Sequence, residues 1–202
     1  MFKFIKTEHP ELIFVNTIIE NKYKNFIFPE EFDYYLCVGG DGTMHKTLSI
    51  YKDKPIFGIG LGSYNFLMNP ILENGKNKKN YTINELSNIF INYIDNLIEN
   101  GLHENSKIVE SYNINVKVIR ENETIFETDS VNDIAIGGDF MDYNTFKLNS
   151  KDELFHNLSM QGSGLCISTV MGSSGFNMNN GGAILRHFDE KGEPNRAWSI
   201  TS

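Results

Sequence analysis

The tetrad Gly39-Gly40-Asp41-Gly42, which follows the apolar run 34–38, constrains the fold of this chain more than any other feature. Glycines let the backbone approach a ligand and turn where a Cβ would clash, and a strand that ends in such a turn is typical of a phosphate-binding loop in an α/β sheet. Asp41 adds one carboxylate that can meet a hydroxyl or a metal. The alternative is an ordinary strand-to-helix turn with Asp41 as the helix N-cap.

The first half of the chain alternates between expected strands and helices. Strands are predicted over 12–15, 32–38 and 55–59, and helices over 43–51 and 82–100. In the last helix, apolar residues recur at helical spacing, Thr82 with Glu85 fits a capping box, and Gly101 follows as a stop signal. This β-turn-α-β order predicts an open α/β sheet.

The second half changes to a strand-like period. Apolar and polar residues alternate over 112–118, which predicts a half-buried antiparallel strand, and 121–123 reads as a hairpin turn. Further short strands are expected over 124–126, 131–136 and 165–169. We therefore expect an α/β domain over 1–103 and a β-rich, sandwich-like domain over 104–202, truncated at its C-terminus, with the boundary near 101–106.

Composition excludes several classes of protein. The formal net charge of −8 argues against a general nucleic-acid binder, which needs clustered Lys and Arg. No apolar stretch reaches the roughly 18 residues of a membrane span. Cys37 and Cys166 lie in apolar strand-like runs without metal-ligand spacing, so reduced thiols in a soluble, cytoplasmic protein are expected.

Three further polar or glycine-rich motifs follow the first turn. Gly58–Gly62 forms a second glycine turn after a strand, without the full dinucleotide fingerprint or a Walker phosphate loop. Asn132-Asp133 pairs an amide with a carboxylate that suits a ribose diol or a base edge, although a polar strand start explains it equally well. The segment from Gly162 to Gly182 is dense in glycine and hydroxyl side chains, which fits a nucleotide site or a surface loop.

Taken in order, these motifs resemble the NAD kinase family. The resemblance rests on the GGDGT box at Gly39–Thr43, the Asn-Asp box at Asn132-Asp133 and the glycine-rich box from Gly162 to Gly182. The stretch from Gly58 to Leu67 is also similar to a family segment, with Asn65 in place of a glycine. The match spans roughly residues 32–202.

The resemblance implies transfer of the ATP γ-phosphoryl group to the 2′-hydroxyl of the adenosine ribose of NAD. Asp41 would take the hydroxyl proton or position metal and phosphate, and amides of the glycine turn would stabilise the transferring charge. Asn132 and Asp133 would hold the ribose and adenine. The remaining implied nucleotide-binding residues are Gly39, Gly40, Gly42, Thr43, Phe66, Gln161, Ser163, Ser174, Gly175, Phe176, Asn177 and Asn179. Mg²⁺ bound with ATP and a homodimer or homotetramer are implied as well; no protein-bound metal site, nucleic acid or membrane is expected.

Two rival functions stay open. In the family's Gly-Asp-Gly-Leu box this chain has Ser163 at the aspartate, and Gln161 stands where a basic residue is common. Both departures favour a non-catalytic nucleotide-binding relative. A lipid kinase with a GGDGT-like turn is the second rival, which the Asn132-Asp133 and Gly162–Gly182 motifs argue against.

Overall fold

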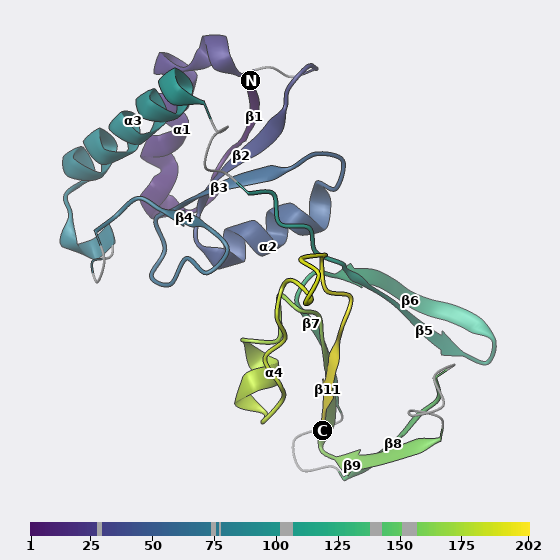
Figure 1. Cartoon of the computed structure of the whole chain (residues 1–202). Helices are drawn as coiled ribbons and strands as arrows, with labels where there is room; N and C mark the ends of the chain where they lie inside the picture. Colours follow the sequence, from purple (N-terminus) through teal and green to yellow (C-terminus); the bar gives the residue numbers. More distant parts are fainter. Residues whose placement is uncertain (28–29, 74–75, 77, 102–106, 138–142, 151–156) are drawn as a thin grey trace. The chain divides into compact units, whose positions relative to one another are not determined.

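The computed structural model describes residues 1–202 except 28–29, 74–75, 77, 102–106, 138–142 and 151–156 (Figure 1). The chain divides into two compact units, Met1–Ile108 and Val109–Ser202. Most of the expected boundary segment, 101–106, lies outside the described residues. Among the described residues, no helix is both long and apolar enough to cross a membrane.

The first unit is built on a parallel four-stranded sheet. Its strands are β1 (Phe2–Ile5), β2 (Tyr34–Gly39), β3 (Ile56–Gly60) and β4 (Asn69–Pro70), hydrogen-bonded in that order. β2 is buried along almost its whole length, which explains its uninterrupted apolar sequence. The expected strands 32–38 and 55–59 are confirmed with small shifts of their ends. The C-terminal ends of β2 and β3 lie side by side, because Gly39 pairs with Gly60.

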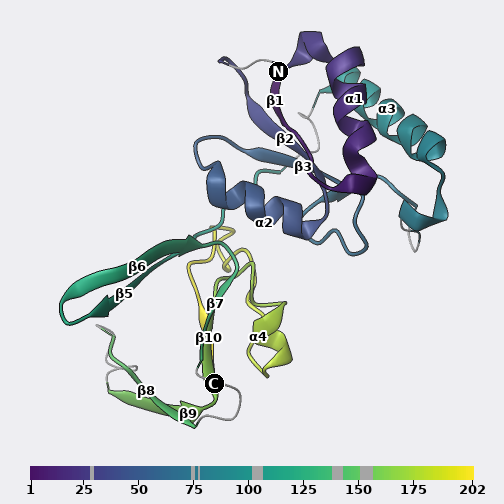
Figure 2. The same ribbon diagram turned by 180° about the vertical axis from the view of Figure 1, so that it is seen from behind.

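Helices cover both faces of this sheet (Figures 1 and 2). The helices α1 (Ile13–Lys22) and α3 (Ile83–Asn100) pack together over one face, while α2 (Asp41–Ile50) contacts β2 and β3 from the other. Alternate residues of β2 serve the two cores: Leu36 and Val38 join the α1–α3 side, and Cys37 joins Met44 of α2. Three short 3₁₀ turns occupy Pro10–Leu12, Lys24–Phe26 and Lys78–Asn80.

The expected strand over 12–15 is wrong. A 3₁₀ turn ends at Leu12, and α1 begins at Ile13. Leu12, Val15 and Ile19 are buried at spacings of three and four residues, so the apolar run is one face of a helix. The first strand is instead β1, the outer strand in the order β1-β2-β3-β4. Lys3 separates its two phenylalanines, so its sequence has no uninterrupted apolar run.

The start of α3 follows the expected capping chemistry. The Thr82 hydroxyl accepts a hydrogen bond from the Glu85 amide, and the Glu85 carboxylate accepts one from the Thr82 amide. Gly101 ends the helix with a positive φ of 70°. The prediction for 82–100 is therefore confirmed, including both of its ends.

The second unit is antiparallel. A hairpin joins β5 (Ile114–Arg120) to β6 (Glu123–Ser130), β8 (Asn144–Leu148) pairs with β9 (Leu158–Gly162), and a three-stranded sheet has the order β11-β10-β7. The strands of that sheet are β7 (Asp133–Gly137), β10 (Gly164–Ser168) and β11 (Ser199–Thr201), and the short helix α4 (Phe176–Asn179) contacts β10 and β11. The expected order of an α/β domain and a β-rich domain is confirmed.

The predicted hairpin turn is also confirmed, but the burial of its strands is not. Glu121 and Asn122 both have positive φ, at 52° and 67°, as a two-residue hairpin turn requires. Within β5 only Ile114 and Val116 are partly buried, and β6 is exposed over all but its last residue. The alternating pattern thus indicates a two-stranded ribbon in which one face is more apolar than the other, and the described residues do not cover that apolar face.

Candidate functional site

Asp41 is the first residue of α2, and Gly40 is its N-cap. The alternative in which Asp41 itself caps the helix is therefore wrong. The amides of Asp41 and Gly42 lie in the first helical turn, where no preceding carbonyl of the helix can accept their hydrogen bonds. The Thr43 amide, in contrast, donates to the Gly40 carbonyl over 2.9 Å. The turn therefore offers two amides, rather than three, to an anion.

The second glycine turn packs directly on the first. The Leu61 amide donates to the Gly39 carbonyl over 2.8 Å. A Cβ built on Gly62 would lie 2.8 Å from the Cα of Gly40, closer than any normal carbon contact. Glycine at position 62 is thus required by the close approach of two backbones.

The loop after the second turn holds the Asp41 carboxylate. Its Oδ1 atom accepts a hydrogen bond of 2.8 Å from the Leu67 amide, 26 residues further along the chain. Within the described part of the chain, Oδ2 accepts no hydrogen bond. One oxygen is therefore fixed by the protein, and the other is available to a ligand.

Asn65 shapes the same loop. Its φ is 56°, in the left-handed region, which explains why a glycine suits this position in the family segment. Two exposed aromatic residues flank it: Tyr64 is 81% and Phe66 80% exposed, and their rings are parallel with centroids 5.9 Å apart. Phe66 is among the predicted nucleotide-binding residues, whereas Tyr64 and the Leu67 amide are not.

In the second unit, Asn132 and Asp133 meet the glycine-rich segment. The Asn132 carbonyl accepts hydrogen bonds from the Thr169 amide and hydroxyl, at 2.8 and 2.9 Å. A Cβ on Gly172 would lie 2.2 Å from the same carbonyl oxygen, so a side chain cannot fit there. The Asn132 amide donates to Asp133 Oδ2 over 3.2 Å. The two boxes therefore form one local structure.

The turn that follows carries the remaining predicted residues. Ser174 and Asn179 are exposed, Gly175 is the N-cap of α4, and Phe176 is 52% exposed. Asn177 is fully buried, and its amide donates to the carbonyls of Ser173 and Ala183. Asn177 thus supports the turn from inside and presents no surface to a ligand.

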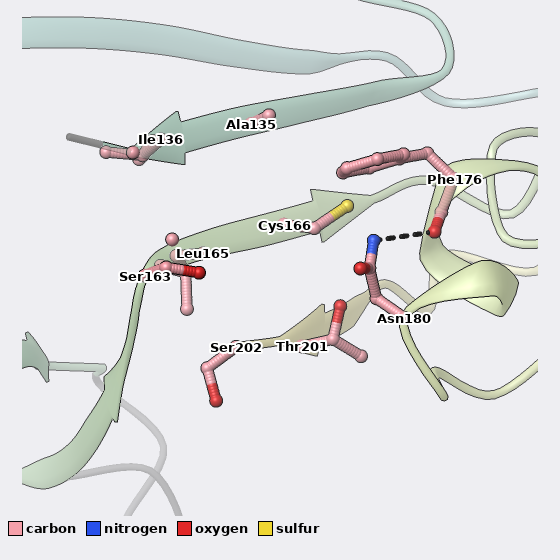
Figure 3. A pocket seen from close by; sticks show the side chains of 11 residues that line it. Ala135, Ile136, Ser163, Leu165, Cys166, Phe176, Asn180, Thr201 and Ser202 are labelled. Carbon is pink, nitrogen blue, oxygen red and sulfur yellow. Dashed lines mark hydrogen bonds between the residues drawn. The ribbon is translucent and has the colours of Figure 1, made fainter. Parts of the chain in front are cut away.

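A cavity of about 230 Å³ lies beside this turn (Figure 3). Phe176 and Asn180 border it from the α4 side, and Thr201 and Ser202 from the β11 side, as Figure 3 shows. The lining is completed by residues of β7, β10 and the loop before β10: Ala135, Ile136, Gly137, Ser163, Gly164, Leu165 and Cys166. Of the predicted residues, only Ser163 and Phe176 line it.

The lining has no ionised side chain of its own. Burial raises the pKa of the Cys166 thiol above its usual range, and the nearby Asp133 charge adds to this effect. Burial likewise raises the pKa of Cys37 in the first unit to about 11, against the opposing hydrogen bond with Thr47. Both thiols are neutral near pH 7, so neither is an activated nucleophile.

Gln161 lies on β9, apart from the Asn132 group in its hydrogen bonding. It is exposed, and its Oε1 atom accepts a 2.9 Å hydrogen bond from the Tyr143 hydroxyl. Apart from Gln161, the predicted residues thus form two groups, one around Asp41 in the first unit and one around Asn132 and Phe176 in the second.

Comparison with known proteins gives one consistent result. The model of the ATP-NAD kinase N-terminal domain matches residues 6–88. An NAD kinase of Christiangramia forsetii is 27% identical over 190 residues, covering 90% of this chain and 57% of that protein. An NAD kinase of Helicobacter pylori is 27% identical over 187 residues, covering 92% and 56%. The chain spans about half the length of the curated relatives it matches.

Solved structures show the same fold. An NAD kinase from Archaeoglobus fulgidus, in complex with ATP, superposes with a TM-score of 0.53 at 18% identity, covering 99% of this chain and 70% of that one. Yeast NADH kinase complexed with NADH gives a TM-score of 0.52 at 14% identity, covering 92% and 62%. Residues 6–88 therefore match the N-terminal domain of the NAD kinase family, and the chain has the fold of solved NAD kinases.

Proposed function

We propose that this chain carries the phosphoryl-transfer chemistry of an NAD kinase, moving the γ-phosphoryl group of ATP to the 2′-hydroxyl of the adenosine ribose of NAD. The arrangement of Asp41 carries the proposal. Its carboxylate lies at the N-terminus of α2, one oxygen is held by the Leu67 amide, and the other is available to a ligand. Named NAD kinases among the relatives, and one family structure with ATP, support the choice of substrates.

The chemistry follows from that geometry. The Oδ2 atom of Asp41 accepts the proton of the ribose 2′-hydroxyl as its oxygen attacks the γ-phosphorus, and the bond from that phosphorus to the bridging oxygen of ADP breaks. The amides of Asp41 and Gly42, with the positive end of the α2 dipole, stabilise the transferring charge. A Cβ at Gly42 would meet no atom within 4 Å, so the turn has open space in which a phosphate could lie.

We propose that Mg²⁺ enters with ATP. Among the described residues, no three His, Cys, Asp or Glu side chains gather closely enough to hold a metal ion. A lone carboxylate suits a magnesium ion that keeps phosphate oxygens and waters as most of its ligands, which is its usual mode in phosphotransferases. Asp41 would contact this ion in the alternative role, in which its carboxylate positions metal and phosphate instead of taking the proton.

The second unit is proposed to hold the rest of NAD. Asn132 and Asp133 offer an amide and a carboxylate beside a turn fixed by Thr169, and Phe176 presents an exposed ring above a neutral cavity. The cavity volume of about 230 Å³ fits a ring or a sugar, not a whole dinucleotide. Assembly into a homodimer or homotetramer is proposed from the family resemblance and is testable by size-exclusion chromatography with light scattering.

The test is NADP formation from NAD, ATP and Mg²⁺, followed with an NADP-specific dehydrogenase. Asp41→Asn keeps the shape and the acceptor for the Leu67 amide but removes the base, so we expect turnover to fall by about 10²–10⁴-fold with NAD binding retained. Undiminished turnover by that variant would remove Asp41 from the chemistry. Saturable NAD binding without NADP formation by the wild-type chain would favour the non-catalytic relative.

A further inference from the structure

We propose that Asn65 is a positioning residue that holds the loop from Gly62 to Leu67 and, through it, the carboxylate of Asp41. The inference rests on the proposed function only for its kinetic consequence. Asn65 stands where the family segment that this stretch resembles has a glycine.

The Asn65 amide closes the second glycine turn. Its Oδ1 atom accepts a 3.0 Å hydrogen bond from the Gly62 amide, and its Nδ2 atom donates a 2.9 Å hydrogen bond to the Gly62 carbonyl. The backbone N–H and C=O of Gly62 are thus both bound by one side chain. The side chain also fills the space beside Gly60, where a Cβ would lie 2.7 Å from its Cγ atom.

This closure reaches Asp41 by two routes. Gly62 lies against Gly40, the residue before Asp41, so fixing Gly62 fixes the surface on which the first turn rests. Leu67, two residues after Asn65, donates its amide to Asp41 Oδ1. Asn65 therefore sets both the position of the loop and the direction in which the carboxylate is held.

The left-handed backbone at Asn65 makes a clean test possible. Asn65→Gly keeps a φ of 56° without strain and removes the side chain, with its two hydrogen bonds and its packing beside Gly60. Asn16 supplies a matched control, because its side chain makes the same pair of hydrogen bonds, each 3.0 Å long, with the amide and carbonyl of Thr7. Asn16→Ala suits the helical backbone of α1.

The experiment is hydrogen exchange of the Leu67 amide, read by NMR in the full chain. We expect exchange to accelerate about tenfold in Asn65→Gly and in Asp41→Ala, which lacks the acceptor for the Leu67 amide, with no further gain in the double variant, because both remove the same restraint. Asn16→Ala is expected to leave the Leu67 amide as in the wild type. Unchanged exchange in Asn65→Gly, or equal acceleration in Asn16→Ala, would overturn the proposal.

The kinetic arm separates this inference from the proposed function. If the wild-type chain forms NADP, Asn65→Gly should lower kcat by about ten- to a hundredfold with little change in the KM for NAD, as expected of a misplaced base. An unchanged kcat in Asn65→Gly would contradict the positioning role. If the wild type forms no NADP, the proposed function fails, and the exchange of the Leu67 amide still decides whether Asn65 positions Asp41.

Discussion

Placing a methyl group at Gly62 probes the contact between the two glycine turns. The new Cβ would lie 2.8 Å from the Gly40 Cα and 3.0 Å from Asn65 Oδ1, whereas ordinary contacts begin at 3.4 Å. The two turns must therefore separate by about 0.6 Å, the difference between 3.4 and 2.8 Å. Neither Gly40 nor Gly62 has a side chain that can rotate away, so the backbone itself has to move.

The expected cost follows from that displacement. Overpacking of a tightly packed region costs about 1–3 kcal/mol, and the hydrogen bond of the Gly62 amide to Asn65 is strained at the same time. We expect Gly62→Ala to lower the free energy of unfolding of the first unit by about 1–3 kcal/mol, which shifts a urea midpoint by about 1 M.

Gly42→Ala is the matched control in the other turn. A Cβ at Gly42 meets nothing within 4 Å, and the residue lies inside α2. Alanine favours helix over glycine by about 0.5–1 kcal/mol, so this variant should be as stable as the wild type or more so. If Gly42 faces the transferring phosphate, its activity should nevertheless fall.

Circular dichroism at 222 nm reports the first unit, because α1, α2 and α3 contain 10, 10 and 18 residues while α4 of the second unit contains four. Fluorescence of the single tryptophan, Trp198, reports the second unit. A Gly62→Ala midpoint equal to that of the wild type would refute the close contact with Gly40. A destabilised Gly42→Ala would refute the open space at that position.

Three further outcomes are expected. Thr82→Ala should destabilise the first unit by about 1 kcal/mol in urea titrations at pH 7. Hydrogen bonds from Thr82 lower the pKa of Glu85, so the stabilisation by Glu85 is present above the usual glutamate pKa and is lost as pH falls through the lowered pKa. A difference in stability between the wild type and Glu85→Ala that persists in acid would contradict this. Burial and, second, the hydrogen bond with Asp95 raise the pKa of Tyr23 to about 12. The contribution of Tyr23 to the free energy of unfolding is therefore full below about pH 10 and is lost as pH rises toward 12. Tyr23→Phe should flatten the alkaline loss of stability, and a plot of stability against pH parallel to that of the wild type would count against this reasoning. Phe66→Ala should leave stability within about 0.5 kcal/mol of the wild type, because the ring is exposed, and raise the KM for NAD about tenfold if the ring stacks on the base, whereas an unchanged KM would exclude stacking.

The first glycine turn was predictable because its signal is local. An apolar strand, three glycines and a helix follow each other within the segment 34–51, and each element is written in its own residues. The partner of Asp41 was not predictable in this way. The Leu67 amide is a backbone group with no sequence signature, and it reaches Asp41 only because β2 and β3 are neighbours.

The error over 12–15 has a different physical origin. A run of four apolar residues does not distinguish a buried strand from one face of a helix, and the decision lies in the residues beyond it. The buried residues Val15, Ile19 and Tyr23 recur at a spacing of four residues, so a longer stretch of sequence indicates a helix. The exposure of the β5–β6 ribbon, in contrast, depends on what packs beside it, and the alternation of apolar and polar residues within its strands does not predict that exposure.

The turn at Glu121 and Asn122 bears on the order in which this chain acquires structure. A hairpin closed by two residues with positive φ needs only neighbouring strands and forms within about 1–10 μs. The β1–β2 pair must first bring Phe2 to Tyr34, across a loop that contains α1, before its ladder gains any hydrogen bond. Loop-closure entropy therefore delays the parallel sheet, and the strands that form the α/β scaffold around Asp41 should assemble after the ribbon has formed.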